Sequence, residues 1–169
     1  MTLDELNRLP AVQAEAEFLK CCGATRWAKA MTDARPFTRV ESLLTKSDEV
    51  WQVLGEHDWL EAFRAHPKIG ERKAAAAQSQ QASSWSAQEQ AQAQEAAAET
   101  RIAIAEGNTV YEDRFGFIFI ICASGKSADE ILSSLNQRLQ NDTGTELQIA
   151  AGEQQKIMRL RLEKLLRAD

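Results

Sequence analysis

Apolar residues recur every three or four positions along most of this chain. The stretch 40–54 shows this most fully, with apolar side chains at Val40, Leu43, Leu44, Val50, Trp51 and Leu54. Such spacing places them on one face of an α-helix. The same periodicity predicts helices over 11–20, 27–31, 59–65, 87–106 and 146–166. We therefore expect an all-α fold, a bundle of about seven to nine helices that forms a single domain over 1–169.

Capping boxes mark where several helices should begin. A Ser or Thr followed three residues later by Glu occurs at Thr2 with Glu5, Thr38 with Glu41, Ser86 with Glu89, Ser127 with Glu130, and Thr143 with Glu146. In each box the hydroxyl and the carboxylate accept hydrogen bonds from N–H groups of the first turn. Gly107-Asn108 is typical of a helix end, which predicts that the helix over 87–106 stops there. The alanine-rich stretch 73–84 gains little from burial, so a loop or a frayed helix is expected.

One stretch breaks the helical rhythm. Residues 115–123 are almost entirely apolar and rich in aromatic and β-branched types, which favours a buried extended segment. The chain offers no second strand of similar strength to pair with it. Its backbone N–H and C=O groups must then find helix ends, side chains or a ligand as partners. The segment is either plain core or a backbone edge that binds a ligand.

Composition and charge narrow the class of protein. With 169 residues, 44% of them hydrophobic and 27% charged, the chain suits one ordinary globular domain. Its net charge of −5, without a basic block, argues against nucleic acid as a partner. No apolar run is long enough to span a membrane, and the acidic N-terminus does not resemble an export signal. We expect a cytoplasmic protein that binds no membrane.

The cysteines and histidines do not suggest a metal site. Cys21, Cys22 and Cys122 lack metal-ligand spacing and are expected to be reduced thiols. The two histidines, His57 and His66, form no known zinc motif. We therefore expect no metal site.

His66 is the strongest candidate for chemistry. The helix over 59–65 must stop near it, because Pro67 lacks a backbone donor and disfavours helical geometry at the preceding residue. A histidine held at a helix end can direct an imidazole that titrates near neutrality into a cleft, as an acid or a base. The alternative is that His66 only caps the helix, where its positive charge suits the dipole.

The stretch Ser86, Ala87, Gln88, Glu89 and Gln90 also has two interpretations. Ser86 and Glu89 fit a capping box, which explains both residues structurally. Gln90 is not needed for that cap. The positive end of a helix dipole, with a hydroxyl, a carboxylate and an amide nearby, would equally suit a small ligand that carries amide groups.

An arginine interrupts the apolar stripe of the last helix. At about 100° per residue, Arg161 falls among Ile157, Met158 and Leu165, whereas Arg159 points to the polar side. A buried charge is costly unless it meets an anion. Arg161 is therefore either paired with an acidic residue of a neighbouring helix, extended to the surface, or a clamp for a substrate carboxylate or carbonyl.

Several motifs together resemble the OHCU decarboxylase family. They include Asp58-Trp59-Leu60-Glu61-Ala62-Phe63, His66-Pro67-Lys68-Ile69-Gly70-Glu71, Ser86-x-x-Glu89-Gln90, the run from Tyr111 to Ala123, and the closing stretch from Ile157 to Leu166. The resemblance spans nearly the whole chain. It implies an all-α enzyme without cofactor or metal, usually a homodimer, that forms (S)-allantoin in urate breakdown.

The resemblance also assigns candidate site residues. His66 matches the catalytic histidine, and we expect Glu89 to assist it by orienting the imidazole or the substrate. The expected substrate contacts are Pro67, Ser86, Ala87, Gln88, Glu89, Gln90, Phe119, Ile120, Ile121, Cys122, Ala123 and Arg161. Two rivals remain open: a non-catalytic helical module that binds a purine breakdown product, and a hydrolase that acts on the preceding product of urate oxidation.

Overall fold

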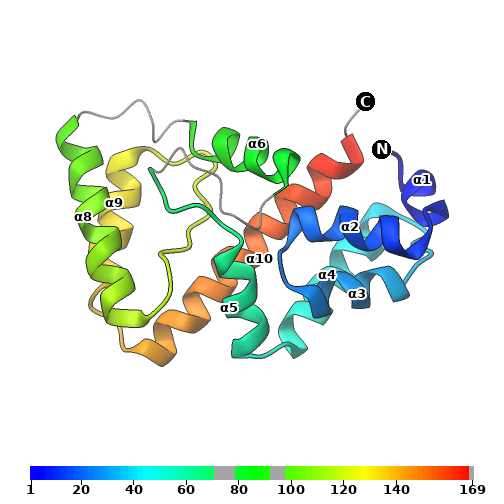
Figure 1. Cartoon of the computed structure of the whole chain (residues 1–169), viewed down its shortest axis with the longest axis horizontal. Helices are drawn as coiled ribbons and strands as arrows, with labels where there is room; N and C mark the ends of the chain where they lie inside the picture. The colour runs from blue at the N-terminus through cyan, green and yellow to red at the C-terminus, as the bar shows by residue number, and fades with distance from the viewer. Residues whose placement is uncertain (71–78, 92–97, 168–169) are drawn as a thin grey trace. The chain divides into compact units, whose positions relative to one another are not determined.

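The computed structural model describes residues 1–70, 79–91 and 98–167, and these parts are helical with no strand (Figure 1). The helices are α1 (Leu3–Arg8), α2 (Ala11–Cys21), α3 (Thr25–Asp33), α4 (Val40–Val53), α5 (Glu56–Arg64), α6 (Gln80–Glu89), α8 (Ala98–Phe115), α9 (Ala128–Arg138) and α10 (Thr143–Arg167). The predicted all-α fold is therefore confirmed. The helices expected over 11–20, 27–31, 40–54, 59–65 and 146–166 correspond to α2, α3, α4, α5 and α10.

Two of the five predicted capping boxes form as expected. At the start of α1, Thr2 Oγ1 accepts the Glu5 N–H at 3.2 Å, and the Glu5 carboxylate accepts the Thr2 N–H at 2.8 Å. Ser127 and Glu130 make the same reciprocal pair at α9. These hydrogen bonds satisfy N–H groups that the helix itself cannot pair.

The boxes at Thr38 and Thr143 are each displaced by one residue. Arg39, not Thr38, is the N-cap of α4, and its N–H donates to Ser42 Oγ at 3.3 Å. Thr143 is already inside α10, because the Asp142 carboxylate accepts the Thr145 N–H at 2.9 Å and starts the helix earlier.

The prediction for residues 73–106 was wrong in two respects. Helix α6 begins after Ser79, whose hydroxyl accepts the Ala82 N–H at 3.2 Å, so Ser86 lies in its last turn rather than at a helix start. Helix α8 runs through Gly107 and Asn108, which were expected to end a helix. Part of the stretch 73–84 is therefore helical, from residue 80 onwards, while residues 73–78 lie outside the described residues.

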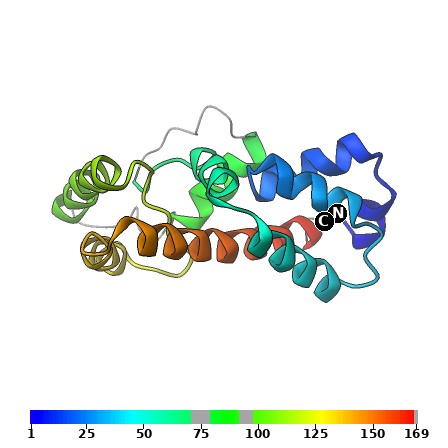
Figure 2. The ribbon, with the colours of Figure 1, turned by 90° about the horizontal axis from the view of Figure 1, so that it is seen from below.

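Tertiary packing explains why Gly107 and Asn108 occur inside a helix. A Cβ atom on Gly107 would lie 2.5 Å from Leu135 Cδ2 of α9, so glycine lets the two helices approach closely. Asn108 Nδ2 donates to the Ile69 carbonyl at 2.9 Å. In both views of the ribbon α8 and α9 lie side by side (Figure 1, Figure 2).

The contacts divide the chain into two compact units, each described here by itself. Unit 1 comprises Met1–Ala62 and Gln155–Asp169, and unit 2 comprises Phe63–Gln154. In unit 1, α3 packs against α2 and α4. Its core includes an edge-to-face pair of Phe18 and Trp27 with ring centroids 5.9 Å apart. The Trp27 indole N–H donates to the Ser47 carbonyl at 3.3 Å, so the buried polar end of that ring is satisfied.

Unit 2 has an aromatic core built around Tyr111. This side chain is fully buried, and its ring contacts those of Phe115, Phe117 and Phe119 at centroid distances of 4.6, 5.8 and 5.1 Å. Phe63, at the end of α5, reaches the same cluster through Phe117 at 5.6 Å. The cluster joins the end of α8 to the non-helical stretch that follows it.

Candidate active site

His66 lies where sequence analysis expected it, directly after the end of a helix. Helix α5 ends at Arg64, and the His66 N–H donates to the Phe63 carbonyl at 3.0 Å. Pro67 follows and prevents further helical hydrogen bonding. Both His66 and Pro67 are half-buried, so the imidazole is held by the protein yet remains partly accessible.

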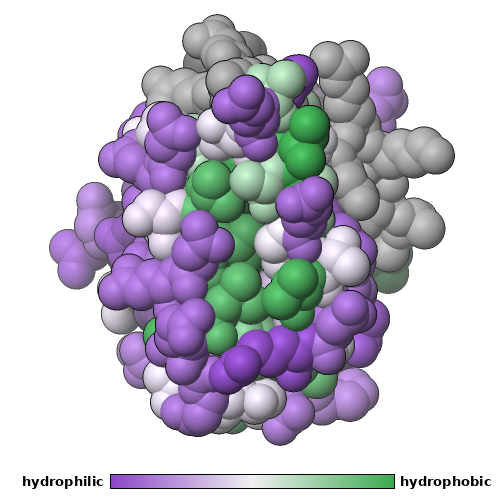
Figure 3. Space-filling view, turned by 90° about the vertical axis from the view of Figure 1, so that its left-hand side faces the viewer, coloured by the Kyte–Doolittle hydropathy of each residue, from purple (hydrophilic) through white to green (hydrophobic). Residues whose placement is uncertain are grey.

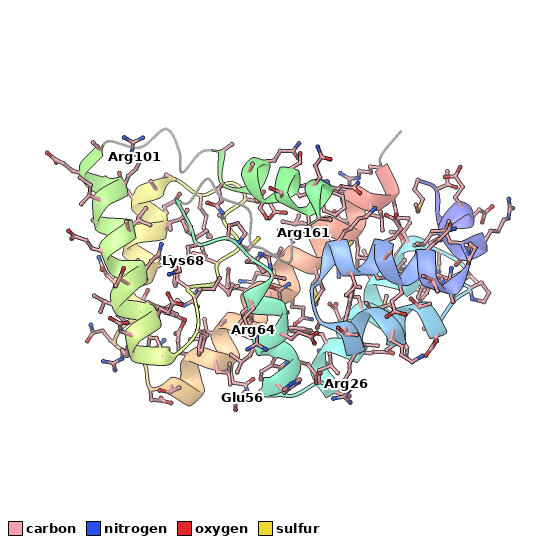
Figure 4. The ribbon with its side chains drawn as sticks, in the orientation of Figure 1. Arg26, Glu56, Arg64, Lys68, Arg101 and Arg161 are labelled. Atoms are coloured by element: carbon pink, nitrogen blue, oxygen red, sulfur yellow. The ribbon has the colours of Figure 1, made fainter. Side chains whose placement is uncertain are left out.

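The turn that carries His66 is fixed by α8 and by the end of α6. Lys68, labelled in Figure 4 beside α8, forms an ion pair with Glu112. The carbonyl of buried Ile69 accepts the Asn108 side-chain amide, as described above. Gly70 takes a positive φ of 85°, and its N–H donates to Gln90 Oε1 at 3.0 Å. Partners from α8 and from the end of α6 thus restrain Lys68, Ile69 and Gly70.

The residues Ser86–Gln90 form the end of α6, and they differ in exposure. Ser86 and Gln90 are buried, Glu89 is half-buried, and Ala87 and Gln88 are exposed. Gln90 is the C-cap, and its N–H donates to the Ser86 carbonyl at 3.2 Å. We expected these residues to lie at the positive end of a helix dipole, and this prediction was wrong. They lie at the C-terminal end of α6, where a helix carries partial negative charge. This end, with the Glu89 carboxylate, favours N–H donors over anions.

The extended segment 118–123 receives its backbone partners from charged side chains. Phe119, Ile120, Ile121 and Ala123 are buried, and Cys122 is half-buried. Arg138 Nη1 of α9 donates to the Ile120 carbonyl at 2.8 Å. The Cys122 N–H donates to Glu153 Oε2 of α10 at 2.7 Å. This confirms that the segment finds partners other than a second strand.

Sequence analysis missed Arg138 and Glu153. Arg138 could have been noticed, because it follows Ile131 by seven residues and Leu135 by three and so falls in the apolar stripe of its helix, as Arg161 does in α10. Glu153 lies at the edge of the stripe of α10 and resembles an ordinary surface charge in the sequence. A hint was available in the segment itself, because a lone buried strand requires outside hydrogen-bonding partners.

A buried polar network around Glu146 holds the Arg138 side chain in place. Glu146, fully buried, accepts hydrogen bonds from Arg138 Nε at 2.7 Å, from Asn141 Nδ2 at 2.8 Å and from the Tyr111 hydroxyl. The Arg138 guanidinium also lies 4.5 Å from the centroid of the Phe119 ring. Burial, followed by the hydrogen bond to Glu146, raises the pKa of Tyr111. The Glu146 side chain therefore belongs to this network and does not form the capping box predicted with Thr143.

Arg161 belongs to unit 1, whereas the candidate residues described above belong to unit 2. Its side chain, labelled in Figure 4, comes from α10, and the residue is 3% exposed and lies on the apolar stripe of that helix. Arg159 is exposed and lies 3.5 Å from Asp48. The inward and outward directions of the two arginines agree with the periodicity. Burial raises the pKa of the Cys21 thiol, and the positive charge of Arg161 opposes that rise. The role of Arg161 in a shared site stays a prediction.

Unit 2 contains the turn of His66, the end of α6 and the anchored segment 118–123, and the Gly70–Gln90 hydrogen bond joins the first two. Over the described ranges, no cluster of three or more His, Cys, Asp or Glu residues has the arrangement of a metal site. Nor does any helix in those ranges have the length and apolarity needed to cross a membrane. These features define a class of all-helical proteins that carry a fixed histidine turn and a non-helical segment whose backbone is held by side chains.

Comparison with known proteins identifies the family. The family model of OHCU decarboxylase matches residues 7–163. The uric acid degradation bifunctional protein TTL of Arabidopsis thaliana is 40% identical over 151 residues, which are 89% of this chain and 47% of that protein. The 2-oxo-4-hydroxy-4-carboxy-5-ureidoimidazoline decarboxylase of Haloferax volcanii is 28% identical over 96% of this chain and 94% of its own length. This chain belongs to the OHCU decarboxylase family.

A solved structure agrees with this assignment. A crystal structure of OHCU decarboxylase in the presence of (S)-allantoin superposes with a TM-score of 0.78 at 38% identity, covering 90% of this chain and 98% of that one. A crystal structure of (S)-allantoin synthase, 17% identical, shares the fold with a TM-score of 0.72. The chain spans about half the length of the Arabidopsis relative.

Proposed function

We propose that this chain is a decarboxylase that converts 2-oxo-4-hydroxy-4-carboxy-5-ureidoimidazoline into (S)-allantoin in urate breakdown, without a cofactor. The observation that carries the proposal is the hydrogen bond of 3.0 Å between the Gly70 N–H and Gln90 Oε1. It joins the turn of His66 to the end of α6, two stretches that the family resemblance assigns to one site. The family match over residues 7–163 supports the same reaction.

The reaction needs an acid or base at a fixed position. When the bond to the carboxylate breaks, the electron pair delocalises into the neighbouring C=N or carbonyl of the ring, and CO2 leaves. A proton must then reach the ring from one face to give a single enantiomer. We assign His66 to the 4-hydroxyl, where it takes or holds the proton as the C–C bond breaks.

The end of α6 suits the ureido arm of this substrate. Ureido and ring N–H groups are donors, and they meet a helix C-terminus and the half-buried Glu89 carboxylate. Gln90 Oε1 already accepts the Gly70 N–H, so the Nε2 group of Gln90 is the part suited to a substrate carbonyl. Substrate contacts at Pro67, at Ser86–Gln90 and along Phe119–Ala123 are part of this proposal.

Arg161 has a restricted role in this mechanism. An ion pair that held the departing carboxylate equally well before and during the reaction would not accelerate the chemical step. We assign Arg161 to positioning the substrate through its carboxylate or a carbonyl.

We further propose a homodimer, in the cytoplasm, that pairs two copies through α8. Figure 3 faces the side of unit 2 that carries α8 and shows apolar side chains gathered within a polar rim. Ile102 and Val110 of α8 are 58% and 54% exposed, and α8 also exposes Arg101 and Glu106. A two-fold axis places the same side of α8 from two copies face to face, so that Ile102 and Val110 would be buried against the second copy. Sedimentation of the wild type as a dimer and of Ile102→Glu as a monomer is expected; a monomeric wild type would refute it.

The decisive experiment measures the stereochemistry of the product from freshly generated substrate. Spontaneous decay gives racemic allantoin, so circular dichroism of the product separates enzymatic from spontaneous turnover. We expect wild type to form (S)-allantoin and His66→Ala to leave only the racemic background. His57→Ala is the matched control, because His57 is the other histidine and its side chain is 88% exposed.

Two other results would refute the proposal. A wild-type protein that binds allantoin analogues and leaves the decay unaccelerated would be a binding module. Consumption of the preceding urate oxidation product, followed separately by absorbance, would indicate a hydrolase.

A further inference from the structure

Two charged side chains hold the same edge of the segment 118–123. The Ile120 carbonyl, bound by Arg138, and the Cys122 N–H, bound by Glu153, lie two residues apart. In an extended chain the polar backbone groups of alternate residues point to the same edge. Arg138 and Glu153 therefore occupy one edge of the segment, and the backbone groups of Ile121 lie on the opposite edge.

The opposite edge has the properties of a binding edge. Ile121 is 5% exposed, and its backbone makes no hydrogen bond to any part of the chain that the structure describes. Buried backbone N–H and C=O groups are rarely left without partners, because each unsatisfied group destabilises the protein. A bound molecule with amide groups would satisfy both groups of Ile121 at once.

The anchored edge is rigid because Arg138 is itself fixed. Its guanidinium contacts Glu146 through Nε and lies over the Phe119 ring. Glu146 is held in turn by Asn141 and Tyr111. Buried networks of this kind allow few alternative side-chain positions.

We propose that Arg138 and Glu153 are positioning residues for the decarboxylation. They hold the segment so that the Ile121 backbone meets the ring of the substrate, and they do not touch the substrate themselves. This inference rests on the proposed function. It assigns a kinetic consequence to two residues outside the substrate contacts expected from the family.

Glu153 gives the sharper test, because it is half-buried, whereas Arg138 is 8% exposed and belongs to the buried network around Glu146. In Glu153→Ala the Cys122 N–H loses the Glu153 carboxylate, and we expect KM to rise about tenfold, which corresponds to the loss of roughly one hydrogen bond to the bound substrate. The fall in kcat should be smaller, and the enantiomeric excess of allantoin should drop. Glu153→Gln keeps an acceptor oxygen and should restore most of the wild-type KM.

Glu163→Ala is the matched control. It also removes a carboxylate from α10, but this carboxylate lies near the exposed Arg159. It should leave KM and enantiomeric excess unchanged. Circular dichroism and Tm of all three variants report on folding. A Glu153→Ala protein with wild-type KM and enantiomeric excess overturns the inference, and so does a Glu153→Gln protein as impaired as Glu153→Ala.

Arg138→Lys provides a second test of the same inference. Lysine keeps the positive charge, but its single ammonium group cannot reproduce the planar fork that contacts Glu146 and the Ile120 carbonyl together. We expect the same rise in KM, and an unchanged KM would count against the inference. The proposed function is judged separately, because its failure would appear as a wild-type protein without any acceleration.

Discussion

Replacing Gly107 with alanine tests how closely α8 and α9 approach each other. The added Cβ atom would lie 2.5 Å from Leu135 Cδ2 and 3.2 Å from Leu135 Cγ. Leu135 is fully buried, so its side chain cannot move aside without disturbing its neighbours. Gly152, inside α10, is the matched control, because a Cβ added there would meet no atom within 4 Å.

Two contributions to the free energy of unfolding distinguish Gly107→Ala from Gly152→Ala: both variants gain from alanine inside a helix, and only Gly107→Ala loses through a clash. Alanine in place of glycine inside a helix stabilises by about 0.5–1 kcal/mol, and this applies to both positions. Overpacking a core destabilises by about 1–3 kcal/mol, and this applies only to Gly107→Ala. Gly152→Ala should therefore be more stable than wild type. The free energy of unfolding of Gly107→Ala should lie about 1–3 kcal/mol below that of Gly152→Ala.

Thermal unfolding followed by circular dichroism measures this difference. For a protein of this size, about 2–4 °C of Tm corresponds to each kcal/mol, so the two variants should differ by about 2–12 °C. In a Leu135→Ala background the clash disappears, and Gly107→Ala should become neutral or stabilising. Equal gains in Tm for Gly107→Ala and Gly152→Ala would refute the reasoning.

Two further predictions concern Arg161 and Tyr111. Arg161→Ala should raise KM at least as much as it lowers kcat, because a positioning contact acts on bound substrate before the reaction; a large fall in kcat at unchanged KM in steady-state kinetics would contradict this. Tyr111 is the chain's only tyrosine, and its pKa is raised from 10.0 by burial and by the hydrogen bond to Glu146. Its near-ultraviolet tyrosinate absorbance should stay absent from the folded protein at pH values where denatured protein ionises. Stability should then fall as the pH rises above about 10, since the unfolded state releases a proton that the folded state keeps. Titration of the folded protein near pH 10 would disprove the burial argument.

Helical periodicity was a reliable guide wherever large apolar residues supplied it. Helices α2, α4 and α10 agree with the predicted ranges because residues such as Phe18, Leu43 and Leu162 fix the buried face. The stretch 73–106 was harder, since its apolar residues are mostly alanine. There the choice between helix start and helix end depended on Ser86 and Gly107, whose roles are set by distant neighbours.

The candidate site also has features that the sequence predicted and features that it did not. The position of His66 at a helix end follows from Pro67, a restriction that acts between adjacent residues. The contribution of Arg138 and Glu153 could not be predicted, because they contact Ile120 and Cys122 from 18 and 31 residues away. Gln90 was expected to contact substrate, and its bond to Gly70 across 20 residues was not foreseen.

Local steric and hydrogen-bonding rules therefore account for helices such as α2, α4 and α10, the capping boxes at Thr2 and Ser127, and the stop at His66, because those interactions join residues four or fewer positions apart. Packing in three dimensions selected glycine at position 107 and charged partners for the extended segment. Those choices minimise clashes and unpaired polar groups between elements that are remote along the chain, and no local pattern contains that information.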